Sequence, residues 1–340
     1  MTTTLLLVIG VIVLALIFDF LNGFHDAANA IATIVVSKTL TPLQAVILAG
    51  FANFIGYFTF GVAVAKMIGK GVVHIDYITL QLLLGALSGA IFWNIFTWVL
   101  GLPTSSSHAL IGGLIGSGIA ANGYKVVIVS GVTKIFSFII IAPLLGLFGA
   151  LFFTIIVFWI FRKVPLIKAN KILKNLQLIS ATFYSIGHGT NDAQKSMGII
   201  GIALYAGHLS SSFEIPKWVV LSCYSAMALG TFFGGWRIVK TMGTSITKIG
   251  AMEGFCAETA SACVLLATQH FGIPVSTTHV IAGAIMGVGT VEHARSVRWV
   301  TARKILWAWI LTIPCSAAFS AMTYLILSFC KAHHLINFIS

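Results

Sequence analysis

The sequence predicts an all-α polytopic membrane protein built from two inverted-topology repeats, each with three crossing helices and one re-entrant helical hairpin. Three observations lead to this prediction. The 340 residues are 58% hydrophobic and only 8% charged, with a mean hydropathy of +1.02, whereas soluble domains carry about 25% charged residues. Apolar runs long enough to cross a bilayer recur along the chain. Two motifs each occur twice, in the same order.

The duplication is visible in two pairs of motifs. "NGFHDAANA" and "HGTNDAQKS" align Asp26 with Asp192, and "GLPTSSSHALIGG" and "GIPVSTTHVIAGA" align His108 with His279. Chance rarely gives two ordered matches, so the chain is a duplicated unit. Its predicted parts are repeat 1 at 1–161 with an acidic motif at 22–33 and a hairpin turn at 102–108, a basic cytoplasmic linker at 162–175, and repeat 2 at 176–340 with an acidic motif at 188–196 and a hairpin turn at 273–279.

The apolar segments give the crossings in order. The turns that join 78–101 to 104–121 and 250–271 to 275–291 are polar but uncharged, as in a turn enclosed by protein at mid-depth. Counting each pair as a hairpin leaves three crossings per half, an odd number that inverts the second half. Segments 78–101 and 250–271 are also long enough to cross fully. The full set is 5–36, 42–65, 78–101, 104–121, 126–161, 177–207, 217–236, 250–271, 275–291 and 304–330.

Basic residues set the predicted orientation. With the N-terminus outside, most Lys and Arg residues lie in predicted cytoplasmic loops, as the positive-inside rule requires. Both termini are then outside. The net charge of +12 comes from these loops and does not indicate a nucleic-acid partner. Pro143 and its repeat partner Pro314 predict kinked, tilted helices for the two long last segments of each half.

Both hairpin turns place hydroxyl groups at the start of a helix. The first N–H groups of a helix lack internal partners and carry partial positive charge, so a start rich in Ser and Thr suits an oxyanion. Two such starts facing each other would hold a tetrahedral oxyanion without a Lys or Arg that slows its release. Ordinary N-capping is the alternative, but two matched copies, each followed by His, favour the anion site. The hydroxyl residues are Thr104, Ser105, Ser106 and Ser107, and Ser276, Thr277 and Thr278.

Asp26 and Asp192 lie within apolar segments, where a charge costs at least ~2.5–3.5 kcal/mol. Carboxylate and amide oxygens suit a hard cation or a proton, and a structural ion pair or a capped helix break is the alternative. Asn22 and Asn29 share the helix face of Asp26. The amides that flank Asp192 are Asn191 and Gln194.

The two acidic motifs differ in the residues beside the acids. His25 stands where the second copy has Asn191, and Lys195 stands where the first has Asn29. Lys195 can neutralise Asp192, and a His can exchange protons near neutral pH. Both changes favour protons over sodium, although Asp26, Asn29 and Asp192 could also hold sodium. Structural and functional roles stay equally open for Asp19, Glu253 and Glu258, and Lys134 can either snorkel to the interface or pair with an acid.

These motifs resemble the PiT family of inorganic phosphate transporters over essentially the whole chain. The forms "GFHDAANAIAT" and "GHGTNDAQKSMG" are most similar to its bacterial phosphate:proton branch. The resemblance implies a homodimer in the bacterial inner (cytoplasmic) membrane, with phosphate held between the hairpin tips near the paired aspartates. Sodium-coupled members carry "GANDVANA", from which this chain differs at His25. The phosphate-binding positions it implies are Thr104, Ser105, Ser106, Ser276, Thr277, Asp26 and Asp192.

Residues and resemblance together predict a secondary active transporter with alternating access around a mid-membrane anion site. It would import inorganic phosphate, or a neutral metal–phosphate complex, by proton symport and without a cofactor. A sodium-coupled phosphate transporter and a sulfate permease are the alternatives within this class, and an ion channel is the alternative outside it. An enzyme is not predicted, because the pairs Ser105–His108 and Ser276–His279 lack a third, orienting acid.

Overall fold

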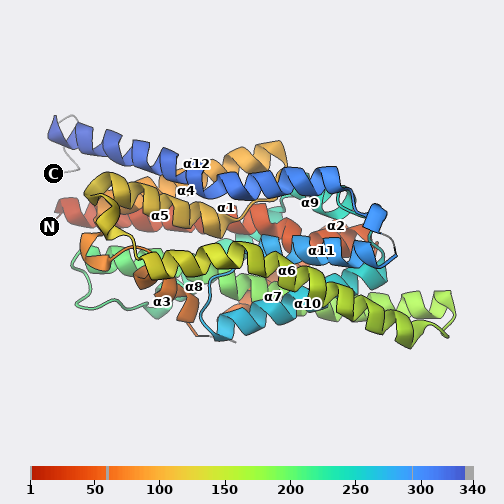
Figure 1. Cartoon of the computed structure of the whole chain (residues 1–340). Coiled ribbons are helices and arrows are strands. Elements are labelled where there is room, and N and C mark those ends of the chain that lie inside the picture. Colours follow the sequence, from red (N-terminus) through yellow and green to blue (C-terminus); the bar gives the residue numbers. More distant parts are fainter. Residues whose placement is uncertain (1, 59–60, 293, 334–340) are drawn as a thin grey trace.

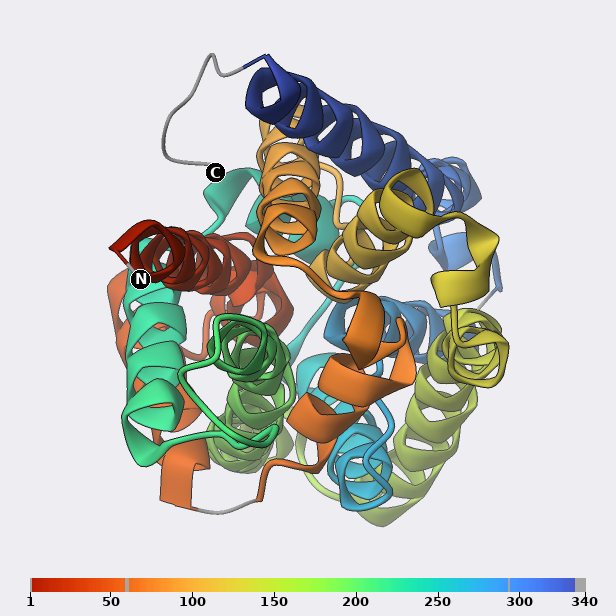
Figure 2. The same ribbon diagram turned by 90° about the vertical axis from the view of Figure 1, so that its left-hand side faces the viewer.

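The apolar runs form long helices that lie side by side along one axis (Figures 1 and 2). This computed structural model describes residues 2–58, 61–292 and 294–333, and in that part of the chain the extended pairing is a single isolated bridge between Val73 and Val127. The α-helices are α1 (Thr2–Val36), α2 (Pro42–Ile55), α3 (Ala63–Gly71), α4 (Leu80–Leu100), α5 (Ser106–Asn122), α6 (Val129–Phe161), α7 (Leu166–Ala206), α8 (Lys217–Phe233), α9 (Trp236–Thr244), α10 (Ala251–His270), α11 (Thr277–Glu292) and α12 (Trp299–Ala332). Short 3₁₀ turns are η1 (Gly56–Phe58), η2 (Ile75–Tyr77), η3 (Tyr124–Val126) and η4 (Ala294–Ser296).

The helices have the length and composition of a membrane protein. Within the described residues, four helices (α1, α4, α6 and α12) are long and apolar enough to cross a bilayer, or up to six if the bent pairs α2–α3 and α8–α9 each form one span. Large apolar side chains such as Phe148 and Phe152 are exposed on the outside, whereas polar side chains are buried inside, as in a bilayer. The prediction of an all-α polytopic membrane protein is confirmed; the division into six crossings and two inverted hairpins stays a prediction.

The observed helices depart from the predicted segments at three places. Segment 42–65 is not one helix, because α2 ends at Ile55 and α3 begins only at Ala63. Segment 217–236 is broken at Gly234, where α8 and α9 meet at 70°. The linker 162–175 is mostly helical, since α7 begins at Leu166, with Ala169 and Leu173 buried and Lys168 and Lys171 exposed. That amphipathic pattern stabilises a helix where charge alone had indicated a loop.

The two hairpins turn on matched glycines. Gly101 ends α4 at φ 66°, and Gly272 follows α10 at φ 62°, a left-handed conformation that Gly adopts without the Cβ penalty. The chain then runs without helix to α5 and α11. These two helices start next to each other, since the Thr278 hydroxyl donates to the Thr104 carbonyl oxygen at 3.1 Å. From there α5 runs toward one end of the bundle and α11 toward the other (Figure 1).

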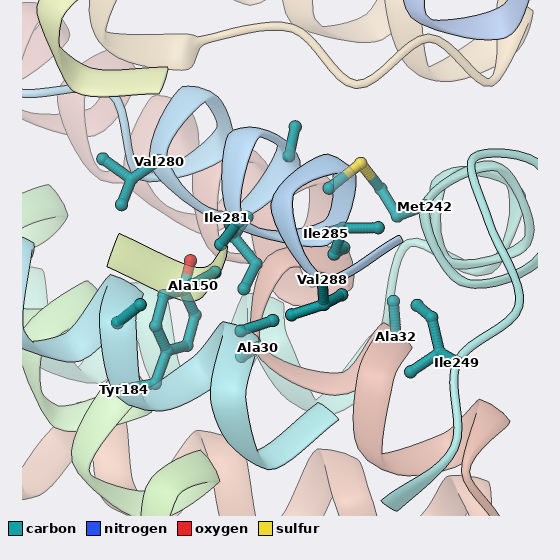
Figure 3. Packing of buried hydrophobic residues seen from close by; sticks show 14 of the residues in the cluster. Ala30, Ala32, Ala150, Tyr184, Met242, Ile249, Val280, Ile281, Ile285 and Val288 are labelled. Atoms are coloured by element: carbon teal, nitrogen blue, oxygen red, sulfur yellow. The ribbon is translucent and has the colours of Figure 1, made fainter. Parts of the chain in front are cut away.

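Each of these inner helices packs on the last helix of the opposite half. A Cβ on Gly116 of α5 would lie 2.1 Å from the Ala317 carbonyl oxygen of α12, and one on Gly287 of α11 would lie 2.2 Å from that of Leu147 on α6. Such close backbone contact is typical of small residues in membrane helix pairs. Figure 3 shows the apolar side of α11, where Ile281 and Ile285 lie near Ala30 of α1. The inner helices are therefore held firmly along their length.

The described ends of the chain lie together. In Figure 1, α1 begins and α12 ends at the same end of the bundle, whereas the connection from α6 to α7 lies at the opposite end. The loop after α1 is at that opposite end too, because Lys174 Nζ of α7 donates to the Lys38 carbonyl oxygen at 2.9 Å. Lys134 is exposed on the outer face of α6.

Candidate functional site

Buried polar side chains converge where the middle of α1 and of α7 meets the starts of α5 and α11. The two long helices bring the acids, and the two hairpins bring the hydroxyl groups. All of the following are buried: Asn22, His25, Asp26, Asn29, Thr104, Ser105, Ser106, Ser107, His188, Asn191, Asp192, Gln194, Lys195, Ser276, Thr277 and Thr278.

Asp26 contacts the first hairpin. Its Oδ1 lies 2.7 Å from His25 Nδ1, and its Oδ2 lies 3.3 Å from Ser106 Oγ. The Ser106 hydroxyl also lies 2.6 Å from Asn22 Oδ1, so Asn22 and Asp26 share one hairpin hydroxyl, as their spacing on the helix predicts. His25 Nε2 lies 3.2 Å from Thr97 Oγ1 of α4. The acid and its histidine therefore join α1 to both arms of this hairpin.

Asp192 contacts both hairpins. Lys195 Nζ donates to Asp192 Oδ1 and also to the Ser107 hydroxyl of the first hairpin. Thr277 Oγ1 of the second hairpin donates to Asp192 Oδ2 at 3.4 Å. His188 Nε2 lies 3.5 Å from the same oxygen, because positions four before and three after an acid share its helix face. The second acid is thus neutralised by a buried ammonium.

Asn29 completes the contact between α1 and the second hairpin. Its Nδ2 donates to Thr278 Oγ1 at 2.9 Å and lies 3.5 Å from Thr277 Oγ1. Since Ser106 contacts α1 and Lys195 binds Ser107, each hairpin start contacts both acidic helices. A shift of either hairpin would change the surroundings of both acids.

Ser105 and Ser276 cap the inner helices. Each Oγ accepts the backbone N–H three residues on, from His108 and His279, at 3.2 Å. This is the N-capping that the sequence offered as the alternative role, although each hydroxyl keeps its own proton to donate. The His108 and His279 rings lie 4.7 Å apart between the two starts. His279 also stacks on Trp309 of α12 at 3.8 Å, which fixes the second turn.

Three side chains could hold a cation together. One ligand atom each from Asp26, His188 and Asp192 lies within 4.8 Å of the others, and all three residues are buried. The sequence predicted Asp26, Asn29 and Asp192 for sodium. The structure brings the two acids together but adds His188, whereas the amide nitrogen of Asn29 faces Thr278.

Two predicted coupling residues face away from the acids. Gln194 Oε1 accepts the backbone N–H groups of Val64 and Ala65 at 2.9 and 3.2 Å, and so caps the start of α3. Asn191 Nδ2 donates to the Val275 carbonyl oxygen at 3.4 Å and supports the second turn. Asn191 and Gln194 lie one and two residues from Asp192, and side chains at that spacing point to other faces of the helix.

Sequence reasoning missed two residues of the site, His188 and Thr97. His188 was detectable, because it lies four residues before Asp192 in the acidic motif itself. Its Nδ1 lies 3.3 Å from Asn53 Oδ1, and Asn53 Nδ2 donates to Thr231 Oγ1 at 2.8 Å. Thr97 gives no signal within its apolar segment, since its contact with His25 joins distant parts of the chain; it also accepts from Thr104 in the turn that follows.

The other glutamates have structural partners. Glu258 Oε1 accepts from Thr33 Oγ1 at 2.7 Å and from Gln177 Nε2 at 3.0 Å, and its Oε2 accepts from Ser180 Oγ at 2.6 Å. These three donors compensate its complete burial. Glu253 accepts the Gly250 backbone N–H at 2.9 Å and caps α10.

A membrane bundle that encloses paired acids between the facing starts of two short helices has the architecture of a membrane transporter. The chain matches the family model described as phosphate transporter family over residues 22–320. It is 50% identical over 319 residues to a probable low-affinity inorganic phosphate transporter of Rhizobium meliloti, covering 94% of this chain and 96% of that one. A counterpart of the same description in Bacillus subtilis is 44% identical, covering 96% of this chain and 99% of that one.

A solved structure also resembles the fold. It is described as the sodium-dependent phosphate transporter, with a TM-score of 0.84 and 26% identity, covering 95% of this chain and 99% of that one. The chain belongs to the phosphate transporter family, and the resemblance to PiT transporters is confirmed.

Proposed function

We propose that this protein imports inorganic phosphate by proton symport, with alternating access around the mid-bundle site. One observation carries the proposal: the hydroxyl-rich starts of α5 and α11 meet each other and both buried aspartates, through Ser106 on Asp26 and Thr277 on Asp192. The relatives described as low-affinity inorganic phosphate transporters support phosphate as the substrate. A homodimer in the bacterial inner membrane with both termini outside belongs to the same proposal, and a neutral metal–phosphate complex is the alternative cargo.

The donor set fits an oxyanion that can itself donate a proton. Hydroxyl groups and the free N–H groups of two helix starts would bind its oxygens. The carboxylates of Asp26 and Asp192 would accept a hydrogen bond from HPO₄²⁻, which sulfate cannot offer. Sulfate would leave these buried carboxylates unpaired, and a site rejects such a ligand strongly. The proposed phosphate ligands are Thr104, Ser105, Ser106, Ser276, Thr277, Asp26 and Asp192.

Charge balance supports a proton as the coupling ion. Lys195 neutralises Asp192, so Asp26 and the arriving dianion need further positive charge in a low-dielectric interior. His25 Nδ1 lies 2.7 Å from Asp26 Oδ1, so an imidazole and a carboxylate lie together as proton-binding groups. In this proposal His25 and Asp26 bind the transported proton, with Asn22, Asn29 and Lys195 holding the geometry.

Sodium coupling is the second candidate. It is favoured by the cluster of Asp26, His188 and Asp192, whose ligand atoms lie within 4.8 Å of one another. The similar solved structure is described as sodium-dependent. In this alternative a sodium ion between the two acids replaces the proton.

The test is uptake of labelled phosphate into proteoliposomes with an imposed pH gradient or an imposed sodium gradient. We expect the pH gradient to drive saturable uptake, and Asp26→Asn to lower it by about tenfold or more, as loss of ~1.4 kcal/mol from one step would. Asp76→Asn makes the same change at an exposed position and should leave uptake unchanged. Normal uptake by Asp26→Asn would overturn the site, and uptake driven by sodium alone would select the second candidate.

A further inference from the structure

Asp19 is a buried carboxyl group that the proposed site does not use. It lies on α1 two turns before Asp26, about 10 Å along the axis, on the same helix face. Its side chain is 0% exposed. No hydrogen bond of normal geometry reaches either of its carboxyl oxygens from the residues that the structure describes, although two side-chain donors lie beside it. Its polar neighbours are Ser196 of α7 and Cys223 of α8.

A comparison with Glu258 shows how unusual this environment is. Both acids are completely buried, but Glu258 accepts three hydrogen bonds and Asp19 accepts none of normal geometry. An ionised carboxylate without donors is very costly in a protein interior, whereas the neutral acid costs much less. The surroundings of Asp19 therefore disfavour a bare carboxylate and stabilise a bound proton.

The charged groups that face Asp19 belong to the transport site. They are Asp192 and Lys195 of α7, and the ionisable Cys223 of α8 also faces it. A dianion bound beside Asp192 would add negative potential at Asp19 and so favour its protonation. By thermodynamic reciprocity, a proton on Asp19 favours binding of that anion by the same factor.

We propose that Asp19 is a second proton-binding site of the transport cycle, two helical turns from Asp26 toward the end at which α1 begins. It takes up a proton when phosphate binds and releases it with phosphate on the other side. The inference rests on the proposed proton symport and adds a residue that carries part of its charge.

The experiment compares net uptake with phosphate exchange in proteoliposomes. Asp19→Asn mimics the protonated acid, so the loaded carrier still turns over but cannot release the proton. We expect exchange of internal for external labelled phosphate to stay within about twofold of wild type. Net uptake driven by the pH gradient should fall by about tenfold or more, which corresponds to ~1.4 kcal/mol. Asp76→Asn, an exposed acid, serves as the matched control.

A second variant separates proton binding from packing. Asn has the shape of Asp, and Glu is one methylene larger, so a packing role predicts that Asp19→Asn is tolerated and Asp19→Glu is not. Proton binding predicts the reverse for net uptake. In weakly buffered detergent solution, a pH indicator should also show fewer protons taken up per phosphate bound in Asp19→Asn than in wild type.

The outcomes are distinct from those of the proposed function. If the rate of uptake by wild type does not change with the imposed pH gradient, proton symport itself is overturned. Proton-driven uptake that survives in Asp19→Asn, with an unchanged proton count, would overturn the role of Asp19 alone. Loss of both net uptake and exchange in Asp19→Glu, with Asp19→Asn unaffected, would do the same, since it would assign Asp19 to packing.

Discussion

The contact between Lys195 and Asp192 is the strongest electrostatic feature of the site. Lys195 is the one buried lysine in the part of the chain that the structure describes, and it binds Asp192 and Ser107 at once. Removing one partner of a buried ion pair leaves a charge without compensation, whereas replacing both partners can be nearly neutral. The pair therefore determines stability as well as charge balance.

Lys195→Met should lower the free energy of unfolding by about 3 kcal/mol, because Asp192 is left as an unpaired buried acid. The double variant Lys195→Met, Asp192→Asn should recover most of that loss. Denaturant unfolding in detergent, followed by circular dichroism, measures both. If the single variant is as stable as wild type, the ion pair does not form in the protein.

Sequence spacing predicted some contacts of the site and missed others. Neighbours on one helix face follow from the 3.6-residue period, and so Asn22 was placed with Asp26. Gln194 was misplaced because it lies two residues from Asp192 and faces α3 instead. Thr97 was missed because its partners come from other helices, and the sequence does not specify how those helices are rotated.

Among the elements, the hairpins depend on their turn glycines. Gly101 at φ 66° and Gly272 at φ 62° reverse the chain at equivalent places of the two halves. Thr241 Oγ1 of α9 donates to the Gly101 carbonyl oxygen at 2.8 Å, which ties this turn to the opposite half. The turn conformation therefore sets where α5 begins, and with it the position of Ser106.

Gly101→Ala should destabilise the protein by about 1 kcal/mol, because a left-handed residue with a Cβ is strained. Gly149→Ala is the matched control, since its Cβ would meet only the Ala260 side chain at an ordinary 3.5 Å. Thermal unfolding in detergent compares the two. A Gly101→Ala variant that is as stable as Gly149→Ala would contradict the left-handed turn.

At this scale the sequence located the membrane-embedded elements but not their bends. Apolarity indicates which residues avoid water, and it placed α1, α6 and α12 well. It does not indicate where a helix breaks within the apolar region, as α8 does at Gly234. The basic residues at the start of α7 led to the prediction of a linker there, although these lysines lie on the exposed face of a helix.

The whole molecule has its described ends on one side and the connection from α6 to α7 on the other (Figure 1). Tyr124 in η3 lies at the first end and is 82% exposed, and Leu166 lies at the second and is 88% exposed. Together with the positive-inside rule, this gives a topology that can be tested from outside the cell.

An impermeant maleimide applied to intact cells should label Tyr124→Cys and Lys331→Cys above the wild-type background. Leu166→Cys should react only after the membrane is made permeable. The opposite pattern would reverse the predicted orientation. Labelling of Tyr124→Cys and Lys331→Cys from different sides would contradict the fold.

The internal repeat predicted the meeting of the two hairpin turns before any coordinates, and the contact between Thr278 and Thr104 agrees with it. In an inverted pair, matched turns of equal length would reach equal depth from opposite ends. The inverted relation of the halves stays a prediction. The packing between the halves, with α5 on α12 and α11 on α6, could not be predicted. Small residues such as Gly116 and Gly287 indicate close helix contact but not which helix is contacted.

This exchanged packing has a consequence for biosynthesis. The ribosome completes α5 long before α12, so the glycine-lined face of α5 has no counterpart while most of the chain is still being made. The first hairpin therefore lies in the bilayer without this contact until the last helix, α12, is inserted and packs on α5. The order in which the helices are synthesised is therefore not the order in which they dock. In a chain that ends before α12, α5 has no helix to pack against on its glycine-lined face.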